Sequence, residues 1–248
     1  MGQGNNYNLF GQSSSAESYV NSARLTSAEL GRRTLLASQT FMSIRALKTI
    51  TIPKGIPTIS PQAFTAAGIS FAVIPSGTTK IMSSAFASSG LVGISMPSSV
   101  TTLENYAFQR CCFLNSLVLP PSITTVGQYI CSENGAVTYT TIPNNVISIG
   151  NYAFNGCNGY ASFVLPPSLM SFSSSAFQYA RSVAFYDFSR HTAVPTLANT
   201  SVFTGIPEDC KIIVPDALYD EWIAATNWST YSSYIIKKND WDASKNNQ

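Results

Sequence analysis

Apolar residues repeat along the central part of the chain at intervals of 22 or 23 residues, and each interval contains a proline after a short apolar run. The stretches SSVTTLENYAFQRC (98–111) and NNVISIGNYAFNGC (144–157), each preceded by a proline, show how closely the intervals match. The prolines that set the register are Pro53, Pro75, Pro97, Pro120, Pro143 and Pro166. A fixed period of this length indicates a repeat architecture.

Other positions keep the same register as the proline. A core residue, usually phenylalanine preceded by alanine, stands eleven positions after it, and apolar residues stand six positions after it and one position before it. The residues of the first of these columns are Phe64, Phe86, Phe108, Cys131, Phe154 and Phe177. Such columns predict that equivalent side chains of successive repeats lie above one another in one core.

The run LKTITIP (47–53) predicts a short β-strand in each repeat. Leu47, Ile50 and Ile52 would face the interior, and Pro53 would end the strand because it has no N–H for the ladder. One repeat cannot bury its own apolar face, so stacked repeats would cover one another, with parallel strands about 4.8 Å apart. The predicted fold is therefore a solenoid of short parallel β-strands stacked at a 22–23-residue period.

The repeat pattern weakens towards both ends, which divides the chain into four segments. These are an irregular N-terminal arm or cap at 1–30, the solenoid at 31–188, a C-terminal capping module at 189–236 and a polar tail at 237–248.

Local signals predict the structure of the two ends. Thr26 and Glu29 fit a capping box, which predicts a helix from residue 27 to about 37. Asp216 would cap an amphipathic helix over 216–227, which we expect to form the C-terminal lid. The polar tail that follows is expected to be mobile.

Composition narrows the possible functions. Charged residues make up 10% of the chain, against about 25% in an average globular protein, and hydrophobic residues at 45% argue against disorder. A net charge of +2 gives no electrostatic basis for binding nucleic acid or an anionic membrane. No apolar run is long enough to span a membrane, and the first twenty residues lack the pattern of a secretory signal peptide.

Residues that could carry catalysis are scarce. His191 is the only histidine, and it stands in DFSRH (187–191), a strand end and loop without a nucleophile signature. We expect it to be a solvated loop histidine. The sequence has no phosphate-binding glycine loop and no cluster with metal-ligand spacing, so it predicts no catalytic, cofactor-binding or metal-binding residue.

The five cysteines do not follow a disulfide pattern. Cys111 and Cys157 occupy the same column two repeats apart, which corresponds to about 9.6 Å, beyond the roughly 7 Å that a disulfide allows between Cα atoms. Cys131 replaces the core phenylalanine of its repeat. These three cysteines are therefore predicted to be unpaired, buried thiols.

The repeat resembles a known family. LNSLVLPPSITTVGQYIC (114–131) and IPNNVISIGNYAFNGC (142–157) are similar to the BspA-like leucine-rich repeat, LxxIxIPxxVxxIxxxAFxxC, and the ending at 210–235 looks like the C-terminal module of these proteins. The resemblance implies a leucine-rich repeat solenoid with a C-terminal helical cap and without catalytic residues. Members of the family are mostly surface or secreted bacterial proteins associated with adhesion and binding of host or matrix proteins, and related repeats occur in phage proteins.

One face of the predicted ladder is a candidate binding surface. The residues four and two positions before each proline would point to solvent, and this face is nearly uncharged. Strand propensity alone also favours threonine, valine and serine at such positions, so a purely structural explanation stays open. The candidate contact residues are Phe71, Val73, Val118, Tyr139, Val164 and Phe185.

Two functional hypotheses follow. The first is a non-enzymatic recognition or adhesion module, exposed on an external surface, that binds a protein or glycan ligand. The second is a structural component of a phage virion, such as a capsid-decorating or tail protein, anchored by its N-terminal arm to other copies or to virion proteins. The arm carries apolar residues that could dock in this way, namely Tyr7, Leu9, Phe10 and Tyr19.

Overall fold

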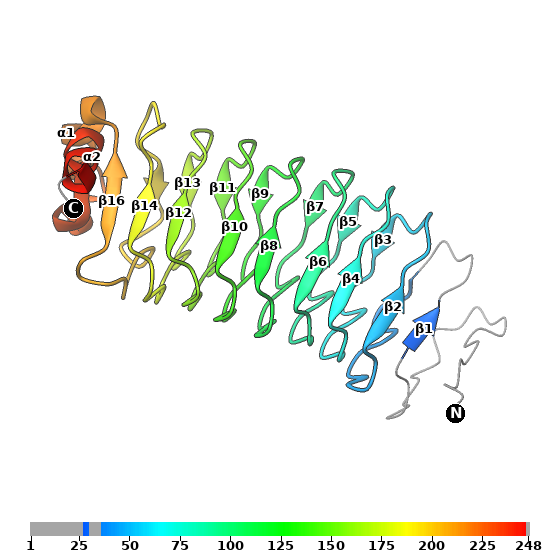
Figure 1. Ribbon diagram of the computed structural model, residues 1–248. Coiled ribbons are helices and arrows are strands. Elements are labelled where there is room, and N and C mark those ends of the chain that lie inside the picture. Colours follow the sequence, from blue (N-terminus) through cyan, green and yellow to red (C-terminus); the bar gives the residue numbers. More distant parts are fainter. Residues whose placement is uncertain (1–26, 30–35, 247–248) are drawn as a thin grey trace.

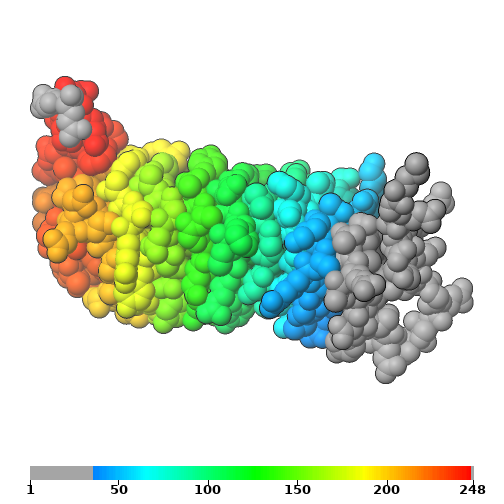
Figure 2. Space-filling view, turned by 60° about the horizontal axis from the view of Figure 1, so that its bottom comes forward, coloured from blue at the N-terminus to red at the C-terminus, as the bar shows by residue number. Residues whose placement is uncertain are grey.

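The computed structural model describes residues 27–29 and 36–246, and it confirms the predicted solenoid. Successive repeats coil one after another along one axis, and each turn of the coil is called a rung below (Figure 1). The space-filling view shows the colours in sequence order along an elongated body, because each rung packs only against its neighbours (Figure 2).

The first side of the solenoid consists of the predicted strands. Their pairing is parallel and keeps equivalent positions opposite one another, as in Tyr139 opposite Ser116 and Phe185 opposite Lys211. The strands of this side are β2 (Thr49–Thr51), β4 (Phe71–Val73), β6 (Gly93–Ser95), β8 (Ser116–Val118), β10 (Tyr139–Thr141), β12 (Ser162–Val164), β14 (Phe185–Asp187) and β16 (Lys211–Val214).

A second row of short strands runs along the solenoid, with one strand after the proline of each repeat. The sequence pattern had indicated only an inward-facing apolar residue at this position. That residue is the second member of a two-residue strand, which pairs with the equivalent strand of a neighbouring rung. The strands of this row are β3 (Thr58–Ile59), β5 (Lys80–Ile81), β7 (Thr102–Leu103), β9 (Thr125–Val126), β11 (Ser148–Ile149), β13 (Ser171–Phe172) and β15 (Thr196–Leu197).

The alanine–phenylalanine pairs form the third side. The Phe64 N–H donates to the Ala85 carbonyl at 2.8 Å and the Phe86 N–H to the Ala107 carbonyl at 2.9 Å, so these turns are hydrogen-bonded from rung to rung. The phenylalanine rings are fully buried and stacked, with ring centroids 5.1 Å apart for Phe64 and Phe86 and 5.7 Å apart for Phe86 and Phe108. The stacked rings therefore form the centre of the core.

The C-terminal module closes the last rung. The 3₁₀ segments η1 (Asp216–Leu218) and η2 (Ser229–Tyr234) flank α1 (Tyr219–Ala224), and the segment packs Trp222 and Trp228 against Phe188, with ring centroids 5.3 Å and 5.5 Å away. Both tryptophans are fully buried. The predicted helical cap is thus present, although its α-helix is shorter than the pattern indicated.

The end of the described chain forms a strand and a helix, which the polar composition of the predicted tail had not indicated. Strand β17 (Ile235–Lys237) pairs with β16, and α2 (Lys238–Asn246) follows it directly. The composition of this segment is polar, but Trp241 packs on the sheet and anchors the helix. Among the described residues, no helix is long and apolar enough to cross a membrane.

The prediction for residues 27–37 was wrong in its first part. Ser27–Glu29 form strand β1, which pairs in parallel with β2 and places Ser27 opposite Thr49. The open edge of β2 offers backbone partners to this segment, and this tertiary pairing prevails over the local capping preference. The proposed docking residues Tyr7, Leu9, Phe10 and Tyr19 lie outside the described residues.

Candidate functional site

The candidate binding surface is the outer face, defined as the residues four and two positions before each proline column on strands β2 to β14. Five of the six predicted residues are strongly exposed, while the middle residue of the strand is buried on β4, β8, β12 and β14, as for Ala72 or Leu117, and partly buried on β2, β6 and β10. The exposed fractions are 65% for Phe71, 66% for Val73, 55% for Val118, 58% for Tyr139 and 52% for Val164. The strand alternation therefore presents these apolar side chains to solvent.

The two exposed aromatic rings lie along the sheet. A Cβ atom at Gly93, the residue paired with Phe71, would stand 3.2 Å from the Cε1 atom and 3.3 Å from the Cδ1 atom of Phe71, so the ring extends over this glycine. The Tyr139 hydroxyl accepts a hydrogen bond from the Thr141 hydroxyl, two residues along the same strand, at 2.8 Å. Both rings consequently offer a flat apolar surface on the solvent side of the sheet.

Phe185 differs from the other five residues. Its ring is partly covered by Trp241 of α2, with centroids 5.3 Å apart. The prediction that Phe185 belongs to the open face was therefore wrong, because the chain after β17 turns back over β14 and β16. The only sequence signal for this was one tryptophan in an otherwise polar segment.

The ladder of the outer face is divided into shorter sheets. Strand β4 pairs with β6, β8 with β10 and β12 with β14, but the structure shows no strand pairing between β2 and β4, between β6 and β8 or between β10 and β12. The repeat that links β6 and β8, beginning at Pro97, is the first in the series with 23 residues instead of 22. The exposed apolar side chains lie on β4 and, beyond β6, on β8, β10 and β12.

His191 is buried, which corrects the expectation of a solvated loop histidine. Its Nδ1 lies 3.1 Å from the Phe188 carbonyl oxygen, and its Nε2 has no hydrogen-bond partner among the described residues. Burial lowers the pKa of His191, and the nearby positive charge of Arg190 lowers this pKa further. Asp187, the nearest acid in sequence, accepts a hydrogen bond from the Ser189 N–H at 2.8 Å, so the three residues do not form a catalytic triad.

The thiols are unpaired, as predicted for Cys111, Cys131 and Cys157. All three are buried, and so is Cys210, while Cys112 is exposed. Burial raises the pKa of Cys111 to about 12 and that of Cys210 to about 12, so neither is a reactive thiolate at neutral pH. In the part of the chain that the structure describes, no three His, Cys, Asp or Glu side chains are grouped to hold a metal ion.

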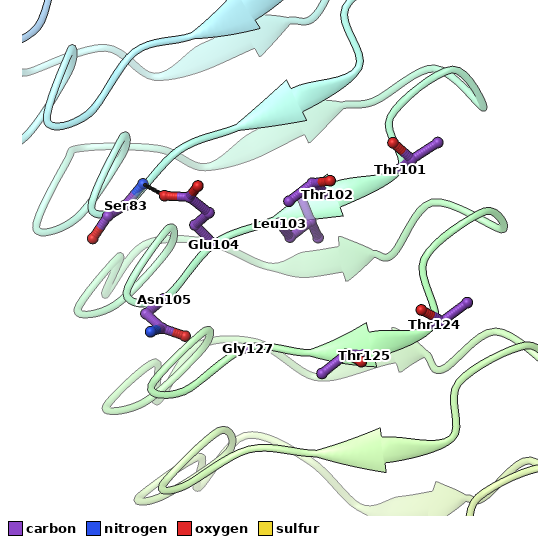
Figure 3. A pocket seen from close by; sticks show the side chains of 9 residues that line it. All are labelled: Ser83, Thr101, Thr102, Leu103, Glu104, Asn105, Thr124, Thr125 and Gly127. Atoms are coloured by element: carbon purple, nitrogen blue, oxygen red, sulfur yellow. Dashed lines mark hydrogen bonds between the residues drawn. The ribbon is translucent and has the colours of Figure 1, made fainter.

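The second row of strands contains a hollow that the sequence did not indicate. It has a volume of about 410 Å³ and lies where β7 and β9 face each other, with threonines, Glu104 and Asn105 around it (Figure 3). It is on a different side of each rung from the outer face.

The fold and the repeat columns define a leucine-rich repeat protein, and comparison with known families gives the type. The family described as "BspA type Leucine rich repeat region (6 copies)" matches residues 34–142 and 124–216. The chain therefore belongs to the BspA-type leucine-rich repeat family, whose repeats are generally non-catalytic.

Two solved structures share the fold. The leucine-rich repeat protein from Bacteroides ovatus ATCC 8483 has a TM-score of 0.58 and 24% identity, over 71% of this chain and 45% of that one. The T. pallidum leucine-rich repeat protein has a TM-score of 0.54 and 19% identity, over 79% of this chain and 81% of that one. The chain thus spans less than half of the Bacteroides protein. No curated protein sequence matches significantly.

Proposed function

We propose that this chain is a non-enzymatic recognition module, exposed on a bacterial surface, that binds a protein partner through the outer face. The observation that carries the proposal is the exposure of Phe71, Val73, Val118, Tyr139 and Val164 on one side of the ladder. Exposed apolar side chains gathered on one face mark interaction surfaces in soluble proteins.

The chemistry of the face favours a protein partner. Asp187 is the only charged residue in the two exposed columns of β2 to β14, and it stands at the end of the face. Flat aromatic rings such as those of Phe71 and Tyr139 are the kind of residue that anchors protein interfaces, where charged side chains are depleted in the centre. The extended sheet also offers a regular surface over several rungs, which is how repeat proteins bind their partners.

A surface location is supported by the family. BspA-like repeats occur mostly in surface or secreted bacterial proteins, and such proteins are associated with binding of matrix components. No observation on the described residues favours the second hypothesis, a virion component.

The proposal can be tested with purified extracellular-matrix glycoproteins as probes. Fibronectin, laminin and collagen would be immobilised in native and enzymatically deglycosylated forms, and binding would be measured by surface plasmon resonance. We expect at least one of them to bind in both forms. Phe71→Ser and Tyr139→Ser should each weaken this binding about tenfold or more, because loss of a central aromatic anchor typically costs over 1 kcal/mol.

Phe113 provides a matched control. Its exposed fraction is 65%, equal to that of Phe71, but it stands in the turn before β8 and not on the outer face. Phe113→Ser should therefore leave the affinity unchanged. Unaltered binding by both outer-face variants, or loss of binding after deglycosylation of the probe, would contradict a protein partner on this face.

A further inference from the structure

The hollow between β7 and β9 exists because the second row of strands opens there. On either side of this junction the backbone N–H groups are paired: Thr101 donates to Thr79 and Ile147 donates to Thr124, both at 2.9 Å. The Thr124 N–H, at the equivalent position, makes no hydrogen bond to the preceding rung, and neither does the Gly127 N–H. The junction therefore leaves backbone donors and acceptors without the partners they have elsewhere.

The third side of the solenoid stays closed at the same junction. Tyr106 donates to the Gln128 carbonyl at 2.9 Å and Phe108 donates to the Ile130 carbonyl at 3.1 Å. The Asn115 N–H, just before β8, also donates to the Val92 carbonyl at 3.1 Å, so the two rungs are joined along the turns and beside the first row of strands, and they separate along the second row. Rung-to-rung hydrogen bonds are therefore present on the two other sides of the junction that contains the hollow.

Two adjacent side chains at the hollow are held in place by backbone hydrogen bonds in opposite directions. The Ser83 N–H donates to the Oε2 atom of Glu104 at 2.9 Å (Figure 3). The Gln128 N–H donates to the Oδ1 atom of Asn105 at 2.9 Å. The second carboxylate oxygen of Glu104 and the Nδ2 group of Asn105 make no hydrogen bond to the described residues. One preorganised acceptor and one preorganised donor consequently remain for a ligand.

Threonine hydroxyls complete the lining. Thr101 and Thr124 line one end of the hollow, and Thr102 and Thr125 line its middle (Figure 3). Each hydroxyl can donate one hydrogen bond and accept two. The Thr101 hydroxyl already donates to the Thr79 carbonyl at 3.3 Å and the Thr125 hydroxyl accepts from Ser148 at 3.4 Å, so these two hydroxyls keep only part of this capacity for a ligand. Leu103 is the only lining residue with a wholly apolar side chain and is 6% exposed, and polar and apolar atoms contribute equally to the surface of the hollow.

We propose that this hollow is a binding site for a neutral saccharide unit. Its volume falls in the range of small-molecule sites, and its mixed donors and acceptors match a ring that carries several hydroxyl groups. The lining contains one carboxylate and no cationic side chain, which disfavours phosphorylated or carboxylated sugars. The nearest strand neighbour with a positive charge is Lys80, which pairs with Thr102 but does not line the hollow.

This site differs from the outer face in position and in ligand chemistry. The outer face carries exposed apolar side chains and lies on the first row of strands, whereas the hollow is lined mainly by polar side chains and lies on the second row. The two proposals can therefore fail independently, and Phe71→Ser should not affect saccharide binding.

The test uses methyl glycosides of glucose, galactose, mannose and N-acetylglucosamine, with N-acetylneuraminic acid and glucose 6-phosphate as charged comparisons. Saturation-transfer NMR on the full chain should show contact with at least one neutral glycoside and with neither charged sugar. Thr101→Trp, a substitution at an exposed position on the rim, should abolish the signal because the indole fills the hollow. Met170→Trp, in the same repeat column but 68% exposed and outside the lining, is the matched control and should retain the signal.

A second variant covers the case in which Thr101→Trp disturbs the fold. Glu104→Gln keeps an oxygen acceptor for Ser83 but replaces a charged hydrogen bond to the sugar with a neutral one, and it should weaken binding about fivefold. The proposal is overturned if no neutral glycoside binds, if binding survives in folded Thr101→Trp or is unchanged in Glu104→Gln, or if the charged sugars bind more tightly than the neutral ones.

Discussion

At the scale of single residues, the core depends on small or apolar side chains at fixed columns, and the exceptions are informative. Cys131 replaces a phenylalanine, and its sulfur accepts a hydrogen bond from the Asn134 amide at 3.2 Å. The Cys157 thiol donates to the Cys131 carbonyl at 2.8 Å. These thiols therefore act as small, weakly polar core groups, and nothing in their environment resembles a nucleophile activated by a base.

Thiol titration provides a direct check at this scale. Because Cys112 is exposed and the other four cysteines are buried, we expect the native protein to react with one equivalent of a thiol reagent, and the denatured, unreduced protein with five. Cys112→Ser should abolish the reaction of the native protein. A denatured count of three or fewer would show a disulfide and would contradict the unpaired core thiols.

His191 should make stability depend on pH. Its pKa is lower in the folded protein than the value of about 6.5 in an unfolded chain, since burial disfavours the charged imidazolium. The unfolded chain then binds more protons between the two pKa values, so the free energy of unfolding falls as the pH decreases below about 6.5 and gains nothing from His191 above it.

The measurement is urea unfolding of the wild type and of His191→Gln between pH 5 and 8. The variant should lose the part of the pH dependence that lies below about 6.5, while effects of the carboxylates persist in both proteins. An NMR titration that places the pKa of His191 at or above 6.5 would contradict the explanation.

At the scale of the elements, each rung contributes two short strands and one turn, and none of these is stable alone. The three-residue strand β8 has one buried side chain, Leu117, between two exposed ones. Its stability comes from the neighbouring rungs and from the stacked phenylalanines, which connect successive turns through the centre of the solenoid.

Removal of one stacked ring should therefore be costly. Phe108→Ala should reduce the free energy of unfolding by about 3–5 kcal/mol, the usual cost of emptying a buried phenylalanine site. Phe113→Ala, at a 65% exposed position five residues later, should change it by no more than about 0.5 kcal/mol. Denaturant unfolding of both variants tests this, and equal stability of the two would contradict the assigned columns.

At the scale of the whole molecule, the two ends of the stack are covered differently. The C-terminal end is sealed by α1, η2 and the buried tryptophans, and at the other end β1 pairs with β2. The residues before β1 carry no repeat column, but they include Tyr7, Leu9, Phe10 and Tyr19. This composition predicts a docking role for the arm rather than a role in the stack.

Deletion of residues 1–25 tests this prediction. The melting temperature by circular dichroism should stay nearly unchanged, because β1 and all the repeat columns are retained, whereas the oligomeric state measured by light scattering should decrease. Unfolding of the truncated protein would instead identify the arm as an N-terminal cap. An unchanged oligomeric state would contradict the hypothesis that the arm docks the chain onto other copies.

The sequence by itself determined the repeat, its register and the inward-facing columns, because a solenoid copies the same local contacts in each rung. It therefore predicted the buried phenylalanines, the exposed Phe71 and Tyr139 and the C-terminal cap. Only the tertiary structure decided how distant segments meet. Trp241 covers Phe185, β1 joins β2 in place of a helix, and His191 is enclosed by the cap, since none of these contacts repeats with the period. The hollow at Glu104 likewise lies at the junction where the repeat lengthens from 22 to 23 residues, and it is recognised as a site only when the strands are placed side by side.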